Sequence, residues 1–231
     1  MTIYYKIQKY LRIPIPLFVK KFFKKYYGKN NLDQQMEKYL NFNNGFYIEL
    51  GAYDGITQSN TYYYEKNKNW KGLLIEPIEH VFKKCKKNRS KENYFFNNAC
   101  VSFGNKKEFI NFTYQNLNSF SSEIIDEEIK NQYLSNPILL RGEKSFTFSA
   151  KAMTLNSILD QSNAPDIIDF FSLDTEGGEF EVLEGINFER YKFKYMLIET
   201  NDFERLKKYL TNKNYIFIEK LNLNDYLFKL N

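Results

Sequence analysis

The chain has 231 residues, of which 43% are hydrophobic and 26% charged, and its formal net charge is +5. This length favours one domain, and the composition is typical of a globular protein, which excludes disorder as the main state. Two cysteines and one histidine exclude a disulfide framework and a four-ligand zinc site, and they argue against a multi-histidine catalytic zinc.

Residues 1–30 are predicted to form a basic, aromatic N-terminal arm. They contain eight Lys and Arg side chains and no acid, so the remaining chain has a net charge of −3. Phe18 and Phe22 recur with Lys21 and Lys25 at helical spacing, which predicts an amphipathic helix over 17–27. Two interpretations stay open. Residues 1–29 rest on an anionic membrane surface, or they pack their aromatic side chains on the domain and leave the lysines in water.

The sequence shows no membrane-spanning segment. The apolar run of the arm, 13–19, contains Pro14 and Pro16 and is much shorter than the roughly 20 residues that a span requires. The arm also lacks the small-residue cleavage site of a signal peptide. The expected location is therefore the cytoplasm, with peripheral binding to the inner face of the membrane if the arm contacts lipid.

Beyond the arm, strands and helices are predicted to alternate. Asp33 is expected to cap a short helix that ends at Leu40. The predicted strands are 46–50, 72–75, 95–101, 168–173, 195–198, 215–220 and 226–230. The predicted helices are 59–66, 79–88, 179–185 and 202–210, with Asp202 as the cap of the last.

This alternation predicts an α/β fold with a mostly parallel sheet, helices on both faces and a C-terminal antiparallel hairpin. In such sheets, ligands bind at the carboxyl ends of the strands, where the strand order reverses. Four of the predicted strands are followed by a glycine or an acid, which predicts a site at this edge; these residues are Gly51, Glu76, Asp174 and Glu199.

The alternation lapses between Gly104 and Met153. Strands are expected at 108–114 and 145–150, and an acidic helix at 123–133. Because most connections have about 4–6 residues, an insertion at about 104–153 favours a substrate lid. The alternative is a peripheral addition that does not contact ligand. The predicted organisation is thus the arm followed by one domain, 31–231, that carries this insertion.

The run YIELGAYDG, at the end of the first predicted strand, is the strongest local motif. Gly51 and Gly55 let the backbone approach a ligand closely, and Glu49 and Asp54 put negative charge beside it. A dinucleotide-binding loop would need a glycine where this chain has Tyr53, and two carboxylates would repel phosphate. The loop therefore predicts a ligand with a cationic, non-phosphate end.

Glu76 ends the second predicted strand, about 25 residues after Gly51. A carboxylate at this place accepts hydrogen bonds from both ribose hydroxyls of an adenosine group. S-adenosylmethionine has this ribose, a positive sulfonium, an ammonium group and no phosphate. It is therefore the predicted cofactor, with its cationic centres near Glu49, Asp54 and Asp174.

Acids also follow a predicted strand in the second half of the chain. Methyl transfer to a hydroxyl requires alignment of the reactants and a base or metal that removes the proton. Asp174 and Glu176 are the candidate catalytic residues, as base or orienting group. Together with Glu199 they are also candidate ligands for magnesium or manganese, and the metal requirement stays open. Glu179 and Glu181 are expected in the exposed first turn of a helix.

The chain resembles the FkbM family of S-adenosylmethionine-dependent methyltransferases. The stretches that carry the resemblance occur in the family's order over roughly 45–200, and they are FYIELGAYDG, SNT, GLLIEP, NACVS and DFFSLDTEGGEFEVLEG. The resemblance implies a Rossmann-like class I methyltransferase fold over 31–231, with seven strands of which the last two form a hairpin. It also implies O-methylation, often of sugars or secondary metabolites.

The resemblance further implies which residues bind the cofactor. Ser59 and Asn60 would face its methionine end, Asn98 the adenine and Asp174 the reacting edge. Tyr53 stands where the family often has asparagine. The remaining implied cofactor-binding residues are Glu49, Gly51, Ala52, Asp54, Gly55 and Glu76.

The leading prediction is an O-methyltransferase that acts on a sugar hydroxyl, either nucleotide-linked or part of a surface polysaccharide. A nucleic-acid methyltransferase is the first alternative. It is disfavoured because an amino-directed enzyme would need an Asn/Asp-Pro-Pro-aromatic motif where this chain has DTEG, and because these carboxylates repel a phosphate backbone. The second alternative is a non-catalytic, membrane-associated module that retains the fold. The oligomeric state stays open.

Overall fold

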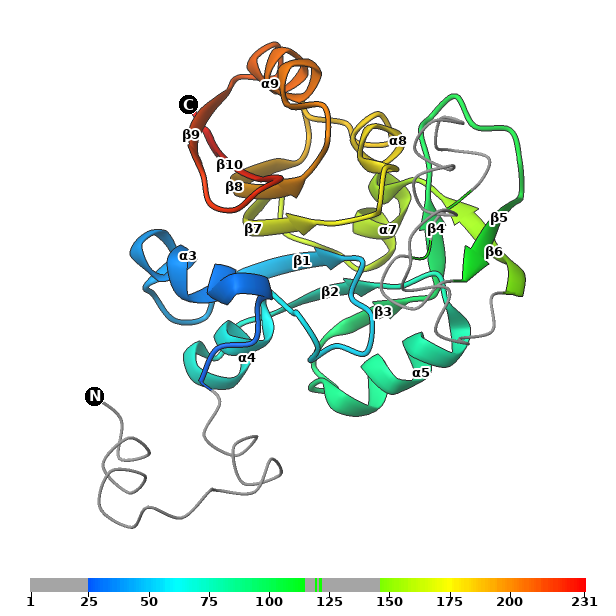
Figure 1. Cartoon of the computed structure of the whole chain (residues 1–231), viewed down its shortest axis with the longest axis horizontal. Helices are drawn as coiled ribbons and strands as arrows, with labels where there is room; N and C mark the ends of the chain where they lie inside the picture. The colour runs from blue at the N-terminus through cyan, green and yellow to red at the C-terminus, as the bar shows by residue number, and fades with distance from the viewer. Residues whose placement is uncertain (1–24, 115–118, 120, 122–145) are drawn as a thin grey trace.

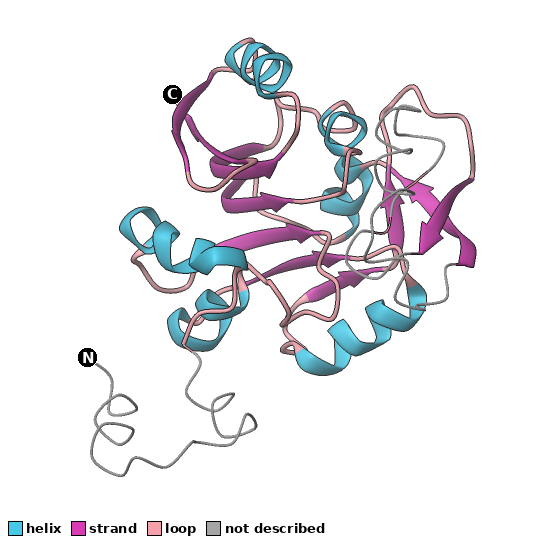
Figure 2. Cartoon of the chain, viewed as in Figure 1, coloured by secondary structure: helices cyan, strands magenta, loops and turns pink. Residues whose placement is uncertain are grey.

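The computed structural model describes residues 25–114, 119, 121 and 146–231. In this part of the chain, helices cover a seven-stranded sheet, and a smaller three-stranded sheet lies beside it (Figures 1 and 2). The strand order in the larger sheet is β3-β2-β1-β7-β8-β10-β9. Its strands are β1 (Phe46–Leu50), β2 (Lys71–Ile75), β3 (Tyr94–Phe96), β7 (Ile167–Leu173), β8 (Lys192–Glu199), β9 (Tyr215–Lys220) and β10 (Asp225–Leu230).

Most neighbouring strands in the larger sheet are parallel. β1 pairs in parallel with β2 and β7, and the parallel pairing continues to β3 and β8. β10 is antiparallel to both β8 and β9. β9 is the last strand at this edge of the sheet. The predicted parallel sheet with a C-terminal hairpin is confirmed. Its strand order reverses between β1 and β7, which is where a ligand crevice forms in an open sheet.

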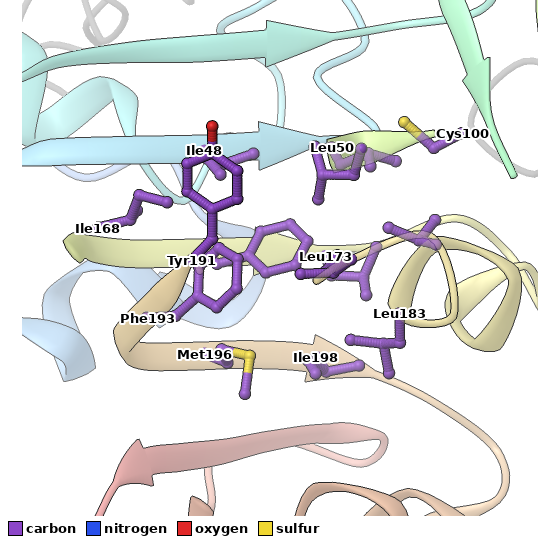
Figure 3. Packing of buried hydrophobic residues seen from close by; sticks show 14 of the residues in the cluster. Ile48, Leu50, Cys100, Ile168, Leu173, Leu183, Tyr191, Phe193, Met196 and Ile198 are labelled. Carbon is purple, nitrogen blue, oxygen red and sulfur yellow. The ribbon is translucent and has the colours of Figure 1, made fainter. Parts of the chain in front are cut away.

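Helices cover both faces of this sheet because alternate side chains of each strand point to opposite sides. Ile48 and Leu50 pack on one face, where Figure 3 shows Leu50, Leu173 and Leu183 together. Tyr47 packs on the other face. The first face is covered by α7 (Leu155–Gln161), α8 (Glu179–Leu183) and α9 (Phe203–Thr211). The second is covered by α3 (Leu32–Leu40), which follows the short helix η1 (Lys29–Asn31), and by α4 (Tyr62–Lys68) and α5 (Glu79–Asn88).

The smaller sheet has the order β4-β6-β5 and lies beyond the carboxyl ends of β1 and β7 (Figure 1). The strand region predicted over 95–101 is confirmed in part: it contains two strands rather than one, because the chain leaves the larger sheet after β3 and enters the smaller one at β4. Between them, Asn97 Nδ2 donates to the backbone oxygens of Glu76 (2.8 Å) and Pro77 (3.0 Å). The strands of the smaller sheet are β4 (Asn98–Cys100), β5 (Phe109–Tyr114) and β6 (Phe146–Met153).

Several helix starts differ from the prediction. Helix α4 begins at Tyr62 rather than at residue 59, because Ser59 Oγ accepts the amide hydrogen of Tyr62 (3.0 Å) from outside the helix. Asp33 does not cap α3; it lies buried inside the helix and accepts from the amide of Tyr27 (2.6 Å). Helix α7 was not predicted at all. The cap of α9 at Asp202 is confirmed.

The predicted helices at 17–27 and 123–133 fall wholly or mainly outside the described residues. Lys25–Tyr27, the described end of the predicted helix 17–27, are not helical. Tyr26 and Tyr27 pack their rings against Tyr63 and Tyr62, at centroid distances of 4.8 and 4.7 Å, so this end of the arm packs on the domain. None of the helices in the described ranges is long and apolar enough to cross a membrane.

Candidate active site

A cavity of about 250 Å³ lies at the carboxyl edge of the larger sheet, where the strand order reverses. The loops that follow β1, β2 and β7 form one side of it, and β4 and β5 of the smaller sheet contribute to the other. Small-molecule pockets begin at roughly 300 Å³ and combine apolar walls with a few polar groups, and this cavity is similar in size and lining. It is therefore the candidate active site.

The structure brings only some of the predicted site residues to this cavity. Those that line it are Gly51, Ala52, Ser59, Glu76, Asn98, Asp174 and Glu176. Those that lie outside its lining are Glu49, Asp54, Gly55, Asn60 and Glu199.

Glu76 places a buried carboxylate in the cavity at the end of β2. Its two oxygens accept from the amides of Tyr53 and Ile78, each at 2.8 Å. Burial raises the pKa of Glu76 to about 7, although these two hydrogen bonds act in the opposite direction. Each carboxylate oxygen can accept more than one hydrogen bond. Glu76 can therefore accept further hydrogen bonds from a ligand.

Gly51 is required by the approach of two loops. Its φ is +83°, and a Cβ atom there would lie 1.9 Å from the backbone oxygen of Asp174. The two loops are joined by the hydrogen bond from the Asp174 amide to the Leu50 oxygen (3.1 Å). Gly51 lines the cavity, but the space of its missing side chain is occupied by protein backbone. The structure thus adds a second reason for this glycine, the close approach of the loop after β7.

Asp54 stabilises the loop from within. Its Oδ1 accepts from the amides of Ile56 (2.9 Å) and Thr57 (2.7 Å), and its Oδ2 accepts from Thr57 Oγ1 (2.8 Å). This is the pattern by which aspartate side chains shape turns. The role that the structure assigns to Asp54 is therefore to shape the loop.

Glu49 is buried beneath the same loop and pairs with Arg89. Its Oε2 lies 3.0 Å from Arg89 Nη1. The carboxylate also accepts from Ser59 Oγ and from the amide of Asn60, both at 2.8 Å. A carboxylate that is paired with a buried guanidinium offers no free charge to a ligand. The structure therefore corrects the interpretation of Glu49 as an acid that faces the cationic end of a cofactor.

Asp174 forms a carboxyl pair with Glu199 at the ends of β7 and β8. The two side chains are hydrogen-bonded to each other. Burial, followed by the charges of Glu199 and Glu176, raises the pKa of Asp174 well above its usual value. Lys29 Nζ lies 3.2 Å from Glu199 Oε1 and offsets part of this negative charge. A carboxylate with a raised pKa is a stronger base when it is ionised, so Asp174 is suited to accept a proton.

The loop that carries Glu176 is held in a strained conformation. Glu176 has a φ of +53°, which costs a non-glycine residue about 1–3 kcal/mol. Glu179 Oε1 supports the loop by accepting from Thr175 Oγ1 and from the Gly177 amide, both at 2.9 Å. Glu179 is only 4% exposed, and Glu181 accepts from a backbone amide at 3.0 Å. Both glutamates lie in the first turn of α8, as predicted, but the expectation that this turn is exposed was wrong, because Glu179 is buried and Glu181 is only partly exposed.

The candidate metal ligands do not form a metal-binding group. Among the residues that the structure describes, no set of three or more His, Cys, Asp or Glu side chains is arranged to hold an ion. Glu199 is instead hydrogen-bonded to Asp174 and forms an ion pair with Lys29.

The sequence did not reveal several residues that line the cavity. Lys29 was assigned to the arm. In the structure it lines the cavity, next to Gly28, which forms an isolated parallel β-bridge with Gln58. Phe112 and Ser121 come from the insertion. No local pattern marks these residues, because they reach the site through contacts between distant segments. The insertion and the end of the arm therefore both contribute to the cavity wall.

The strand order and the acid-lined cavity at its reversal define a Rossmann-like methyltransferase fold. A family model described as "Methyltransferase FkbM domain" matches residues 49–217. Because this match covers more than half of the chain, the chain belongs to the FkbM methyltransferase family and is a methyltransferase. The resemblance predicted from its motifs is confirmed. No curated protein matches the chain significantly.

Proposed function

We propose that this methyltransferase uses S-adenosylmethionine and methylates a hydroxyl group of a sugar, either nucleotide-linked or part of a surface polysaccharide. One observation carries the proposal. Glu76 and Asp174 follow the two strands that flank β1, and both line the same cavity. This arrangement provides an acid for a ribose on one side and a base on the other.

The lining of the cavity fits this cofactor. Glu76 can accept two hydrogen bonds from adjacent ribose hydroxyls, as acids at this strand end do in nucleotide-binding folds. Ile78 and Ala99 provide apolar surface for an adenine ring. Three acids, Glu76, Asp174 and Glu176, line the cavity against one base, Lys29, so a positive charge is favoured there. When bound, S-adenosylmethionine supplies an electrophilic methyl group on a positive sulfonium.

Asp174 is proposed to accept the proton of the acceptor hydroxyl as that hydroxyl attacks. The proton would then reside on a carboxyl group that is hydrogen-bonded to Glu199. Glu176 lies two residues further along the same loop and also lines the cavity, so it is proposed to orient the acceptor. Holding the reactants in line accounts for much of the rate enhancement in a displacement of this kind.

The acceptor class is inferred from the remaining wall of the cavity. Ser119 and Ser121 supply hydroxyl groups, and Phe112 supplies an aromatic ring. Hydroxyl groups both donate and accept hydrogen bonds, as the hydroxyls of a sugar require. The acids of the cavity would repel a nucleic-acid backbone.

Titration with S-adenosylmethionine in a calorimeter tests the cofactor. The wild type should bind saturably, and Glu76→Ala should bind about 10- to 100-fold more weakly, because hydrogen bonds to a charged group are lost. Glu79→Ala is the matched control. Glu79 is the first residue of α5, its side chain is 70% exposed, and it forms a salt bridge with Lys83 at 2.6 Å. The affinity of Glu79→Ala for S-adenosylmethionine should stay within about threefold of that of the wild type. A wild type without saturable binding would remove the basis of the proposal.

The affinity for an adenosine ligand should fall as the pH decreases below about 7. Ionised Glu76 accepts two hydroxyl hydrogen bonds, whereas the protonated group gives up part of this capacity, and its pKa is about 7. If only the ionised form binds, the Kd should be roughly tenfold higher at pH 6 than at pH 8. S-adenosylhomocysteine is a suitable probe because it lacks the sulfonium charge. The Kd of Glu76→Gln should change less over this range, and a constant wild-type Kd would contradict the role of Glu76.

The acceptor is tested with isotopically labelled cofactor and a panel of nucleotide sugars, glycans and nucleic acids, with and without a chelator. We expect label in a sugar hydroxyl. Label in a nucleic acid would overturn the acceptor class, and loss of transfer with chelator would establish a metal requirement.

A further inference from the structure

A buried arginine lies behind the loop that forms the cofactor side of the cavity. Arg89 directly follows α5, its side chain is 0% exposed, and it does not line the cavity. A buried charge is costly unless it is paired and hydrogen-bonded. Arg89 satisfies this condition through Tyr47 Oη in β1, to which its Nη2 donates (2.7 Å), and through two groups of partners, one around the loop and one in α4.

The first group of partners lies at both ends of the loop. Nη1 of Arg89 donates to the backbone oxygen of Gly55 (3.0 Å) and to Ser59 Oγ (3.2 Å), and it pairs with Glu49. Nη2 donates to Thr61 Oγ1 (2.9 Å). Since Ser59 lines the cavity, one guanidinium connects the base of the loop, its turn and a residue of the cavity wall.

The second group of partners lies away from the cavity. Nε of Arg89 donates to Glu65 Oε2 (2.8 Å) in α4. Burial tends to raise the pKa of Glu65, but the charge and hydrogen bond of Arg89, together with the hydrogen bonds from Ser90 and Tyr47, outweigh this effect and lower the pKa. Glu65 also accepts from the Ser90 amide (2.9 Å) and Asn93 Nδ2 (2.6 Å). These contacts attach α4 to the segment after α5 without reaching the loop.

Gly55 provides the space for this arrangement. Its φ is +80°, and a Cβ atom there would lie 2.8 Å from Arg89 Cγ and 3.0 Å from Cys85 Sγ. Gly55 does not line the cavity. The second glycine of the YIELGAYDG motif is therefore explained by Arg89 rather than by the approach of a ligand.

We propose that Arg89 is a positioning residue for cofactor binding. It holds residues 51–59 in the conformation that lines the cavity, and it acts through Glu49, Gly55 and Ser59 without touching the ligand. Pre-ordering a loop raises affinity because binding no longer has to order it. The identity of the ligand rests on the proposed function.

The two acids that pair with Arg89 form a matched pair of variants. Glu49→Gln and Glu65→Gln each remove one buried negative charge beside the same guanidinium, but only the first alters the loop side. Glu49→Gln and Arg89→Lys should raise the Kd for S-adenosylmethionine about tenfold, because the loop is no longer held. The Kd of Glu65→Gln should stay within about twofold of the wild type, even if this variant loses as much Tm as Glu49→Gln does.

A double variant separates positioning from direct contact by Glu49. If Glu49 acts through Arg89, Arg89→Lys/Glu49→Gln should bind no more weakly than the weaker of the two single variants, since both remove one interaction. If the Kd increases of the two single variants multiply in the double variant, Glu49 contacts the ligand directly, and this part of the inference is overturned.

Hydrogen exchange in the ligand-free protein provides a readout that does not depend on the cofactor. The amides of 52–59 should exchange about tenfold faster in Glu49→Gln and Arg89→Lys, and at the wild-type rate in Glu65→Gln. Unchanged exchange in the first two variants would overturn the inference even if the wild type binds S-adenosylmethionine. Faster loop exchange with a wild type that does not bind would support the positioning role and contradict the proposed cofactor.

Discussion

Replacing Gly51 by alanine should strongly destabilise the protein. A left-handed backbone costs alanine about 1–2 kcal/mol, and the new Cβ would lie 1.9 Å from the Asp174 backbone oxygen. The loop after β7 would have to move, which breaks the hydrogen bond between the Asp174 amide and the Leu50 oxygen. We expect a loss of at least about 3 kcal/mol in the free energy of unfolding, or roughly 6–12 °C in Tm.

Thermal unfolding of Gly51→Ala beside Gly104→Ala measures this effect. Gly104 is a suitable control because a Cβ atom there would meet no heavy atom closer than Ser102 Oγ at 3.8 Å. The Tm of Gly104→Ala should indicate a change of no more than about 0.5 kcal/mol in the free energy of unfolding. Equal Tm values for the two variants would mean that β1 and the loop after β7 do not approach each other as closely as described.

Asp174→Asn should lower the rate of methyl transfer by about 10²- to 10⁴-fold, because an amide cannot take up the hydroxyl proton. The Kd for S-adenosylmethionine should rise by no more than about tenfold, because the amide keeps the size of the side chain and removes one of the three acids that line the cavity. The wild-type rate should increase with pH as Asp174 ionises, since burial and the neighbouring carboxylates raise its pKa. In Asp174→Asn this rise should be absent.

Initial rates with an acceptor from the panel measure this prediction. Asp166→Asn is the control because Asp166 is exposed just before β7, at the opposite end of that strand. It should retain the wild-type rate and pH profile. Full turnover by Asp174→Asn would place the base elsewhere, with Glu176 as the next residue to change.

Parts of the fold that depend on local pattern were predicted closely. The bounds of β1 and α5 agree with the prediction, because an apolar run closed by a glycine and a helical hydrophobic period are both local signals. The split between β3 and β4 was missed, because the alternation of a strand does not reveal which sheet it joins. Helix α7 was missed although Thr154 accepts from the Ser157 amide as its cap.

The site was predicted only in part, because only some of its residues are marked by a local sequence pattern. Glu76 and Asp174 stand where apolar runs end, and parallel strands bring such ends to one edge. Glu49 was interpreted as a free acid because its partner Arg89 lies 40 residues away. Lys29 was assigned to the arm, although it pairs with Glu199 across 170 residues.

The order of strands and helices, and the edge at which their acids gather, follow from the amino-acid sequence because periodicity and turn residues act over a few positions. Which of those acids carries free charge depends on segments that are distant in the chain. Folding places a guanidinium against Glu49 and leaves Glu76 and Asp174 at the cavity, and only these distances decide which carboxylates can act on a ligand.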